Sequence, residues 1–123
     1  MNIDELTLGQ IKEIQKLISN DHPPFRFIGS DVIIRTYSAG CWFGRLEQKD
    51  GNEVILSGAR RLWRWWAAGD SISLSGVAIH GVIYEKSKIV ESVPAIWLEA
   101  IEIAPCTDKA AKSLREAPDV QAE

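Results

Sequence analysis

The chain has 123 residues, of which 46% are hydrophobic and 25% charged, and this is the size and composition of one globular domain. Its formal net charge of -3 argues against bulk nucleic-acid binding, which needs a basic surface, but allows a small anion held by a few arginines. We find no signal peptide and no run of roughly 18 apolar residues that would span a membrane. We therefore expect a cytoplasmic protein with no membrane partner.

Residues 6–19 are expected to form an N-terminal helix, because Thr7 and Gln10 have the spacing of a capping box and isoleucines follow at helical spacing. Pro23 and Pro24 cannot continue a helix, so it ends before them. The domain organisation that we expect is an N-terminal helical segment at 1–24, a single α+β domain at 25–117 and a flexible tail at 118–123.

Strand chemistry begins after Phe25. The segments expected to form strands are rich in β-branched and aromatic residues and are separated by turn residues such as Ser38-Ala39-Gly40 and Asp50-Gly51. A bend or bulge is expected at Ser57-Gly58. The predicted strands in this part of the chain are 32–37, 41–47, 53–56 and 60–66.

A short middle helix is expected to start at Asp70 or Ser71 and to run to Ile79, with Gly81 ending it. Residues 84–93 are interpreted as a polar loop, 94–103 as the last strand and 108–115 as a C-terminal helix capped by Thr107. The order predicts the α+β class, with a small antiparallel sheet of four to five strands, an N-terminal helix, a short middle helix and a C-terminal helix.

No catalytic constellation is visible, so we expect a protein that is not an enzyme and needs no cofactor or metal. His22 and His80 stand apart from any nucleophile pattern, and there is no glycine-rich phosphate loop. Cys41 and Cys106 are too few for a disulfide framework and do not have metal-site spacing, so we interpret them as reduced, partly buried thiols.

The segment from Ala59 to Ala68 is the best candidate for function. In a strand, one face carries Arg61, Trp63 and Trp65, and the other carries Arg60, Leu62, Arg64 and Trp66. Either face pairs guanidinium with indole, and arginine binds phosphate while indole stacks on a base. The alternative is that Trp63 and Trp65 belong to the core and the arginines stack over them in solvent.

Three further residues are candidates for the same ligand. Tyr37 offers a hydroxyl or a stacking surface, although it is equally explained as a half-buried strand tyrosine. Ser71 and Ser73 lie at the predicted start of the middle helix, where free amides hold phosphate. Helix capping explains Ser71 equally well.

Three strings, IRTYSAGCWFGRL, GARRLWRWW with SISLSGVA, and LEAIEIAPCT, resemble a small family of phage proteins of unknown function over residues 31–115. That family is similar to the phage anti-Thoeris sponges, which sequester a cyclic ADP-ribose isomer. The resemblance implies an α+β homo-oligomer, at least a dimer, that binds a cyclic nucleotide in the host bacterial cytoplasm and blocks immune signalling. The pair Gly69-Asp70 and the loop 84–93 depart from the family pattern, which puts the identity of the ligand in doubt.

The hypothesis that follows is that the protein acts as a sponge, which binds a cyclic nucleotide and sequesters it without cleaving it. Arginines among Arg60, Arg61 and Arg64 would neutralise a pyrophosphate, and an aromatic ring among Trp63, Trp65, Trp66 and Tyr37 would stack on adenine. The main alternative is a protein-binding phage module that inhibits a host factor, and its expected sign is an exposed apolar patch containing Trp42 or Trp97 with no arginine pocket beside it. A binder of single-stranded nucleic acid and an enzyme that cleaves cyclic nucleotides are further alternatives.

Overall fold

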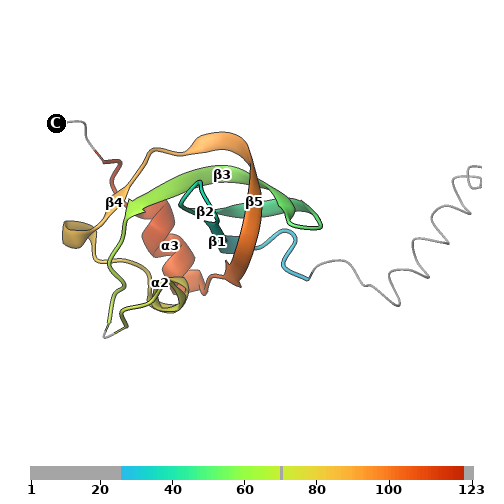
Figure 1. Cartoon of the computed structure of the whole chain (residues 1–123). Helices are drawn as coiled ribbons and strands as arrows, with labels where there is room; N and C mark the ends of the chain where they lie inside the picture. The colour runs from blue at the N-terminus through green and yellow to red at the C-terminus, as the bar shows by residue number, and fades with distance from the viewer. Residues whose placement is uncertain (1–25, 70, 121–123) are drawn as a thin grey trace, which may run out of the picture.

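A computed structural model describes residues 26–69 and 71–120 (Figure 1). The described chain is α+β, as predicted from the sequence, with five strands, two α-helices and a short 3-10 helix. The elements in chain order are β1 (Asp31–Thr36), β2 (Cys41–Asp50), β3 (Glu53–Arg64), α2 (Leu74–His80), η1 (Tyr84–Lys86), β4 (Lys88–Ile89), β5 (Val93–Pro105) and α3 (Asp108–Glu116). The helix predicted at 6–19 lies outside the described residues.

The antiparallel sheet closes on itself. The strand order is β2-β1-β5-β3-β4, and β2 also pairs with β3. Four strands therefore form a small barrel, and β4 extends it alongside the last residues of β3. The sequence predicted antiparallel strands but not this closure, because closure depends on pairing between residues far apart in the chain.

Side chains on the two faces of each strand enter different cores. On β1, Val32 and Ile34 point into the barrel, whereas Ile33 points toward the helices. Helices α2 and α3 lie together against one side of the barrel and cover this second core (Figure 1). The core inside the barrel consists of Val32, Ile34, Trp42, Leu46, Val54, Leu56, Ala59, Leu98 and Ala100.

The segments predicted as a third strand at 53–56 and a fourth at 60–66 form one continuous strand, β3. The bend expected at Ser57-Gly58 is a β-bulge, where the pairing with β2 changes register and Gly58 has a φ of 54°. Glycine adopts this left-handed conformation without steric penalty, so the strand bends without ending. β3 stops at Arg64, and Trp65 and Trp66 therefore follow the strand.

Both described α-helices begin at hydroxyl caps. Ser73 caps α2, whereas the sequence favoured Asp70, which lies outside the described residues, or Ser71. The predicted cap of α3, Thr107, is confirmed, and α2 ends before Gly81 as predicted. Within residues 26–69 and 71–120, no helix has the length and apolar character that a membrane crossing needs.

The guanidinium of Arg60 fastens the end of α3 to the barrel. The residue is only 5% exposed. It donates hydrogen bonds of 2.9 Å to the carbonyl oxygens of Leu114 and Val90 and of 2.7 Å to that of Ala117. It also forms a 2.7 Å ion pair with Asp119. Because carbonyl groups at a helix end lack partners within the helix, this side chain completes the end of α3.

The first residues of the predicted tail are bound to the barrel. The amide of Val120 donates to the carbonyl oxygen of Ile89 at 2.9 Å, and Asp119 pairs with Arg60. Residues 118–120 therefore belong to the packed structure instead of a flexible tail, and residues 121–123 lie outside the described part of the chain.

We predict that Arg60→Met lowers the free energy of unfolding by about 3–5 kcal/mol, because it leaves several buried carbonyl oxygens and a carboxylate without their donor. Urea unfolding followed by tryptophan fluorescence measures this. Arg61→Met is the matched control, because its guanidinium lies over the Trp42 ring and its loss should cost about 1 kcal/mol. Equal losses for the two variants would show that Arg60 does not hold the end of α3.

Candidate functional site

The chain after β3 is held against the segment between α2 and β4. Leu62 pairs with Ile89 and Arg64 pairs with Lys88, and the register shift between these pairs places a bulge at Trp63. Further on, the amide of Ile83 donates to the carbonyl oxygen of Trp66 at 2.9 Å. Two antiparallel segments, 63–68 and 82–88, therefore carry the side chains of this region.

Two exposed indoles lie beside lysines on these segments. Trp66 is 50% exposed, and the Lys86 ammonium is 4.8 Å from the centroid of its ring. Trp63 is 69% exposed, and the Lys88 ammonium lies 6.0 Å from its ring centroid. We call Trp63, Trp66, Lys86 and Lys88 the tryptophan–lysine surface. Such exposure of large aromatic rings is typical of binding surfaces.

A hollow of about 190 Å³ opens beside Trp66, and Trp65, Ala67, Ser71 and Ile72 complete its lining. Trp65 is partly buried, because it also packs against the core under the helices. The hollow is smaller than the roughly 300–1,000 Å³ of pockets that enclose a whole drug-sized ligand. It therefore has room for one ring of a ligand, and the remainder would lie outside over the lysines.

Close packing fixes the serine side of this hollow. A β-carbon on Gly76 of α2 would lie 2.0 Å from the Ser71 hydroxyl oxygen, so only glycine leaves room for Ser71 here. The Ser71 and Ser73 hydroxyl oxygens are 3.3 Å apart. Ser73 also accepts a hydrogen bond from the Gly76 amide at 3.2 Å, so it serves as a helix cap.

The three candidate arginines point in three directions. Arg60 is buried at the end of α3, and the Arg61 guanidinium lies 4.6 Å from the ring centroid of Trp42. Arg64 is exposed, and its side chain forms no ion pair or hydrogen bond within residues 26–69 and 71–120. Since the bulge at Trp63 interrupts the alternation, Arg64 does not share the buried side of Arg60 and Leu62. A clamp built from all three arginines is not assembled in the chain described.

Tyr37 lies away from the other candidates. It follows β1 in the turn before β2, it is 90% exposed, and it lines a different hollow, of about 280 Å³. Thus it is neither a half-buried strand tyrosine nor a neighbour of the Trp66 hollow. The structure brings together Trp65, Trp66 and Ser71, with Ser73 bonded to Ser71, and it leaves Trp63 and Arg64 exposed at the end of β3.

The two lysines of this region are not marked as candidates by the sequence. Lys86 and Lys88 fall in the segment 84–93, for which the sequence predicts a polar loop, whereas the structure forms η1 and β4 there. The pairing of Arg64 with Lys88 brings these cations beside the indoles. Lysines near turns are common in any sequence, so the residues around Lys86 and Lys88 contain no signal that would mark them as part of a site.

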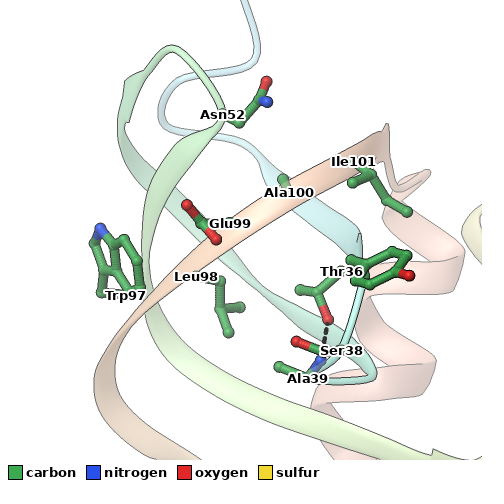
Figure 2. A pocket seen from close by; sticks show the side chains of 10 residues that line it. Thr36, Ser38, Ala39, Asn52, Trp97, Leu98, Glu99, Ala100 and Ile101 are labelled. Carbon is green, nitrogen blue, oxygen red and sulfur yellow. Dashed lines mark hydrogen bonds between the residues drawn. The ribbon is translucent and has the colours of Figure 1, made fainter.

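The second hollow lies between β5 and the turn after β1 (Figure 2). Trp97 and Ile101 of β5 are 55% and 52% exposed at its edges, and Glu99 lies between them. The Trp97 indole donates a 3.2 Å hydrogen bond to the carboxylate of Glu53. The complete lining is Thr36, Tyr37, Ser38, Ala39, Asn52, Trp97, Leu98, Glu99, Ala100 and Ile101.

The thiols are poorly suited to nucleophilic chemistry. Both cysteines are unpaired and partly buried. Burial, together with the nearby carboxylate of Asp31, raises the pKa of Cys106 to about 12, and burial also raises the pKa of Cys41. The thiolate is the reactive form, so a raised pKa lowers reactivity. Among residues 26–69 and 71–120, no group of three His, Cys, Asp or Glu side chains could hold a metal ion.

Comparison with known proteins identifies a family but no activity. A family model described as a domain of unknown function (DUF6948) matches residues 29–114, which is more than half of the chain. No curated protein matches the sequence. The family match does not link the chain to the anti-Thoeris sponges, so that resemblance stays a prediction.

We predict that Cys106 resists alkylation in the folded protein. At pH 8, a thiol with a pKa of about 12 has a thiolate fraction about a thousandfold below that of an ordinary cysteine. Iodoacetamide labelling, read out by mass spectrometry of the peptides, should show slow modification that accelerates as the pH rises toward 12. Labelling in urea is the control, and equal rates in the folded and unfolded protein would contradict the burial of this thiol.

Proposed function

The chain belongs to the DUF6948 family, whose description assigns no function, and we propose that it binds and sequesters a small cyclic nucleotide without cleaving it. The observation that carries the proposal is the half-exposed indole of Trp66, which has the Lys86 ammonium over its ring and an apolar hollow at its side. This combination offers a flat surface for a base next to a cation for a phosphate.

A ligand would use these groups in different ways. A purine would lie on Trp66 with part of its ring in the hollow, and stacking of a base on an aromatic ring contributes about 1–3 kcal/mol. Lys86 would move from the ring face to a phosphate oxygen, and Arg64 is exposed nearby in the chain to contact a second one. Each charge-assisted hydrogen bond contributes about 1.5–3 kcal/mol.

These magnitudes favour a site completed by a second subunit. One stacked base and two charged contacts give about 4–9 kcal/mol in total. Nanomolar binding needs about 12 kcal/mol after the costs of association have been met. A single tryptophan–lysine surface is therefore too small for a sponge that works at low ligand concentration. This supports a homo-oligomer, at least a dimer, in which a second copy closes the site.

The resemblance to the anti-Thoeris sponges suggests which ligand is sequestered and what the sequestration does in the host cell. A phage protein present in the host cytoplasm at a concentration above the dissociation constant would remove a cyclic ADP-ribose isomer from solution, and the host effector would stay silent. Sequestration needs no catalytic group, and the described residues offer no activated thiol. The cations at this surface are Lys86 and Lys88, in place of the clustered arginines expected from the sequence.

We predict that isothermal titration calorimetry detects binding of at least one cyclic ADP-ribose isomer. Trp66→Ala should weaken that binding about 5- to 150-fold through loss of stacking, and Lys86→Gln should weaken it about 10- to 150-fold through loss of a charged contact. Trp97→Leu is the matched control, since it removes an exposed indole at the other hollow and should leave the affinity unchanged.

The bound ligand should be recovered intact when the complex is heated and the supernatant analysed by mass spectrometry. Recovery of a hydrolysed product would identify an enzyme instead of a sponge. Absence of heat with every isomer at tens of micromolar protein, or unchanged binding by the Trp66→Ala variant, would overturn the proposal.

A second candidate function, binding of a protein partner, is favoured by one specific observation. Trp97 is exposed together with Tyr37 and Ile101 around a hollow whose lining contains no arginine or lysine. This is the arrangement expected of a protein-binding module.

A further inference from the structure

The two neighbours of β5 in the sheet pair with different halves of it. β1 covers it from Pro105 to Ala100, where Thr36 is the last paired residue of β1. β3 covers the other side from Glu99 to Val93. Between Val93 and Trp97, the side of β5 that faces away from β3 therefore has no neighbouring strand among residues 26–69 and 71–120. An unpaired edge of this kind is a template for another extended chain.

The hydrogen-bonding pattern shows which groups this edge presents. On the β3 side of β5, the amide of Ala100 donates a 2.7 Å hydrogen bond to the carbonyl oxygen of Asn52. Because backbone groups alternate sides along a strand, the even-numbered residues from 94 to 98 face β3, and Ala95 and Trp97 face the open edge. Pro94 has no amide hydrogen, but its nitrogen faces Gly58 of β3 and not the open edge. This proline therefore does not block the edge.

The surface beside the edge is apolar and aromatic. Trp97 and Ile101 are more than half exposed, and Tyr37, in the turn after β1, is almost fully exposed and lines the same hollow. Figure 2 shows Trp97, Glu99 and Ile101 spaced along β5, with Ser38 and Ala39 in the turn after β1 as further lining residues of the hollow. A chain that paired with Ala95 and Trp97 would cover this hollow with its side chains.

Two carboxylates give the surface a charge preference. Glu53 and Glu99 are direct cross-strand partners, and like charges in such a pair are destabilising. Glu53 accepts a hydrogen bond from the Trp97 indole, but no described lysine or arginine forms a salt bridge with either carboxylate. A cation from outside would relieve this repulsion.

We propose that the open edge of β5 binds an extended peptide segment of a partner protein, in which lysine or arginine alternates with β-branched or other apolar residues. The segment would add as an antiparallel or parallel strand through the backbone groups of Ala95 and Trp97. Its cationic side chains would lie on the face of Trp97, Glu99 and Glu53, and its apolar side chains would lie on the opposite face, over Leu98 and Ala100 in the lining of the hollow. This inference rests on the second candidate function and does not depend on nucleotide binding.

Charge favours such a peptide over a second copy of the chain. A second copy would bring its own Glu53 and Glu99 to the same edge, and each chain carries a formal net charge of -3. A basic segment brings the opposite charge. The edge is also short, since it runs only from Val93 to Trp97, which suits a linear segment better than a large flat interface.

The probe is the peptide Ac-VKVTVKV-NH2, added to the full-length protein. Amide hydrogen exchange followed by NMR should show new protection at Ala95 and Trp97, and a titration of Trp97 chemical shifts gives the dissociation constant. The peptide Ac-VEVTVEV-NH2 should bind at least about tenfold more weakly because its charges match those of Glu53 and Glu99. A lysine peptide N-methylated on the residues that face the edge should not bind, because it lacks the donors.

Two substitutions test the edge and the charge separately. Ala95→Pro removes one edge amide, which no strand in the described chain uses, and should weaken the lysine peptide at least about tenfold while the fold persists. Glu99→Gln should weaken it and reduce the dependence of binding on salt. Glu102→Gln is the matched control, since this residue lies on the same strand but already pairs with Arg35 at 2.8 Å.

Three results would overturn the proposal. The first is no binding of the lysine peptide at millimolar concentration. The second is equal binding by wild type and Ala95→Pro. The third is protection of the Ala95 and Trp97 amides before any peptide is added, together with a dimeric mass in sedimentation, because the edge would then belong to a second copy. Trp66→Ala should leave peptide binding unchanged, so failure here and failure of nucleotide binding are distinguishable.

Discussion

The hydrogen bonds and ion pair of the buried Arg60 guanidinium are the interactions on which the position of α3 against the barrel depends. A cation that is 5% exposed is stable only when nearly all of its donors are used, and here they bind carbonyl oxygens from α3 and from the chain after β4, together with one carboxylate. The alternation of a strand then places Arg61 and Trp63 on the opposite face, which Ala59 shares inside the barrel, and both residues are exposed beyond Ala59. Binding of Arg60 to the end of α3 therefore keeps Trp63 on the face away from the helices.

Local departures from regular strand geometry decide which side chains reach the surface. The bulge at Trp63 leaves two successive residues of β3, Trp63 and Arg64, exposed. On β5, the pairing with β1 shifts between Ala100 and Glu102, so Ile101 and Glu102 are both exposed. A regular strand would place Glu99 and Glu102 on opposite faces, as the sequence implied. A bulge thus exposes a residue that the regular alternation of strand side chains would bury.

Much of the fold could be predicted because its signals are local. The β-branched runs, the Thr107 cap and the stop at Gly81 depend on residues within one or two turns of chain. The candidate site could be predicted only in part. Trp65, Trp66 and Ser71 meet because they are close in sequence, whereas Lys86 reaches Trp66 through the pairing of distant segments. The buried position of the Arg60 side chain depends on where α3 packs. That packing is a contact between residues far apart in the chain, so no local pattern around Arg60 predicts it.

The two candidate surfaces lie at opposite ends of one strand. β3 has 12 residues, and at about 3.3 Å per residue its ends are separated by up to roughly 36 Å. Arg64 marks the end beside the basic tryptophan–lysine surface, and Glu53 marks the end beside the acidic edge of β5. Since the first end offers cations and the second offers carboxylates, one ligand would not satisfy both. The distribution of charge therefore agrees with the two separate proposals, an anion at one end of β3 and a basic chain at the other.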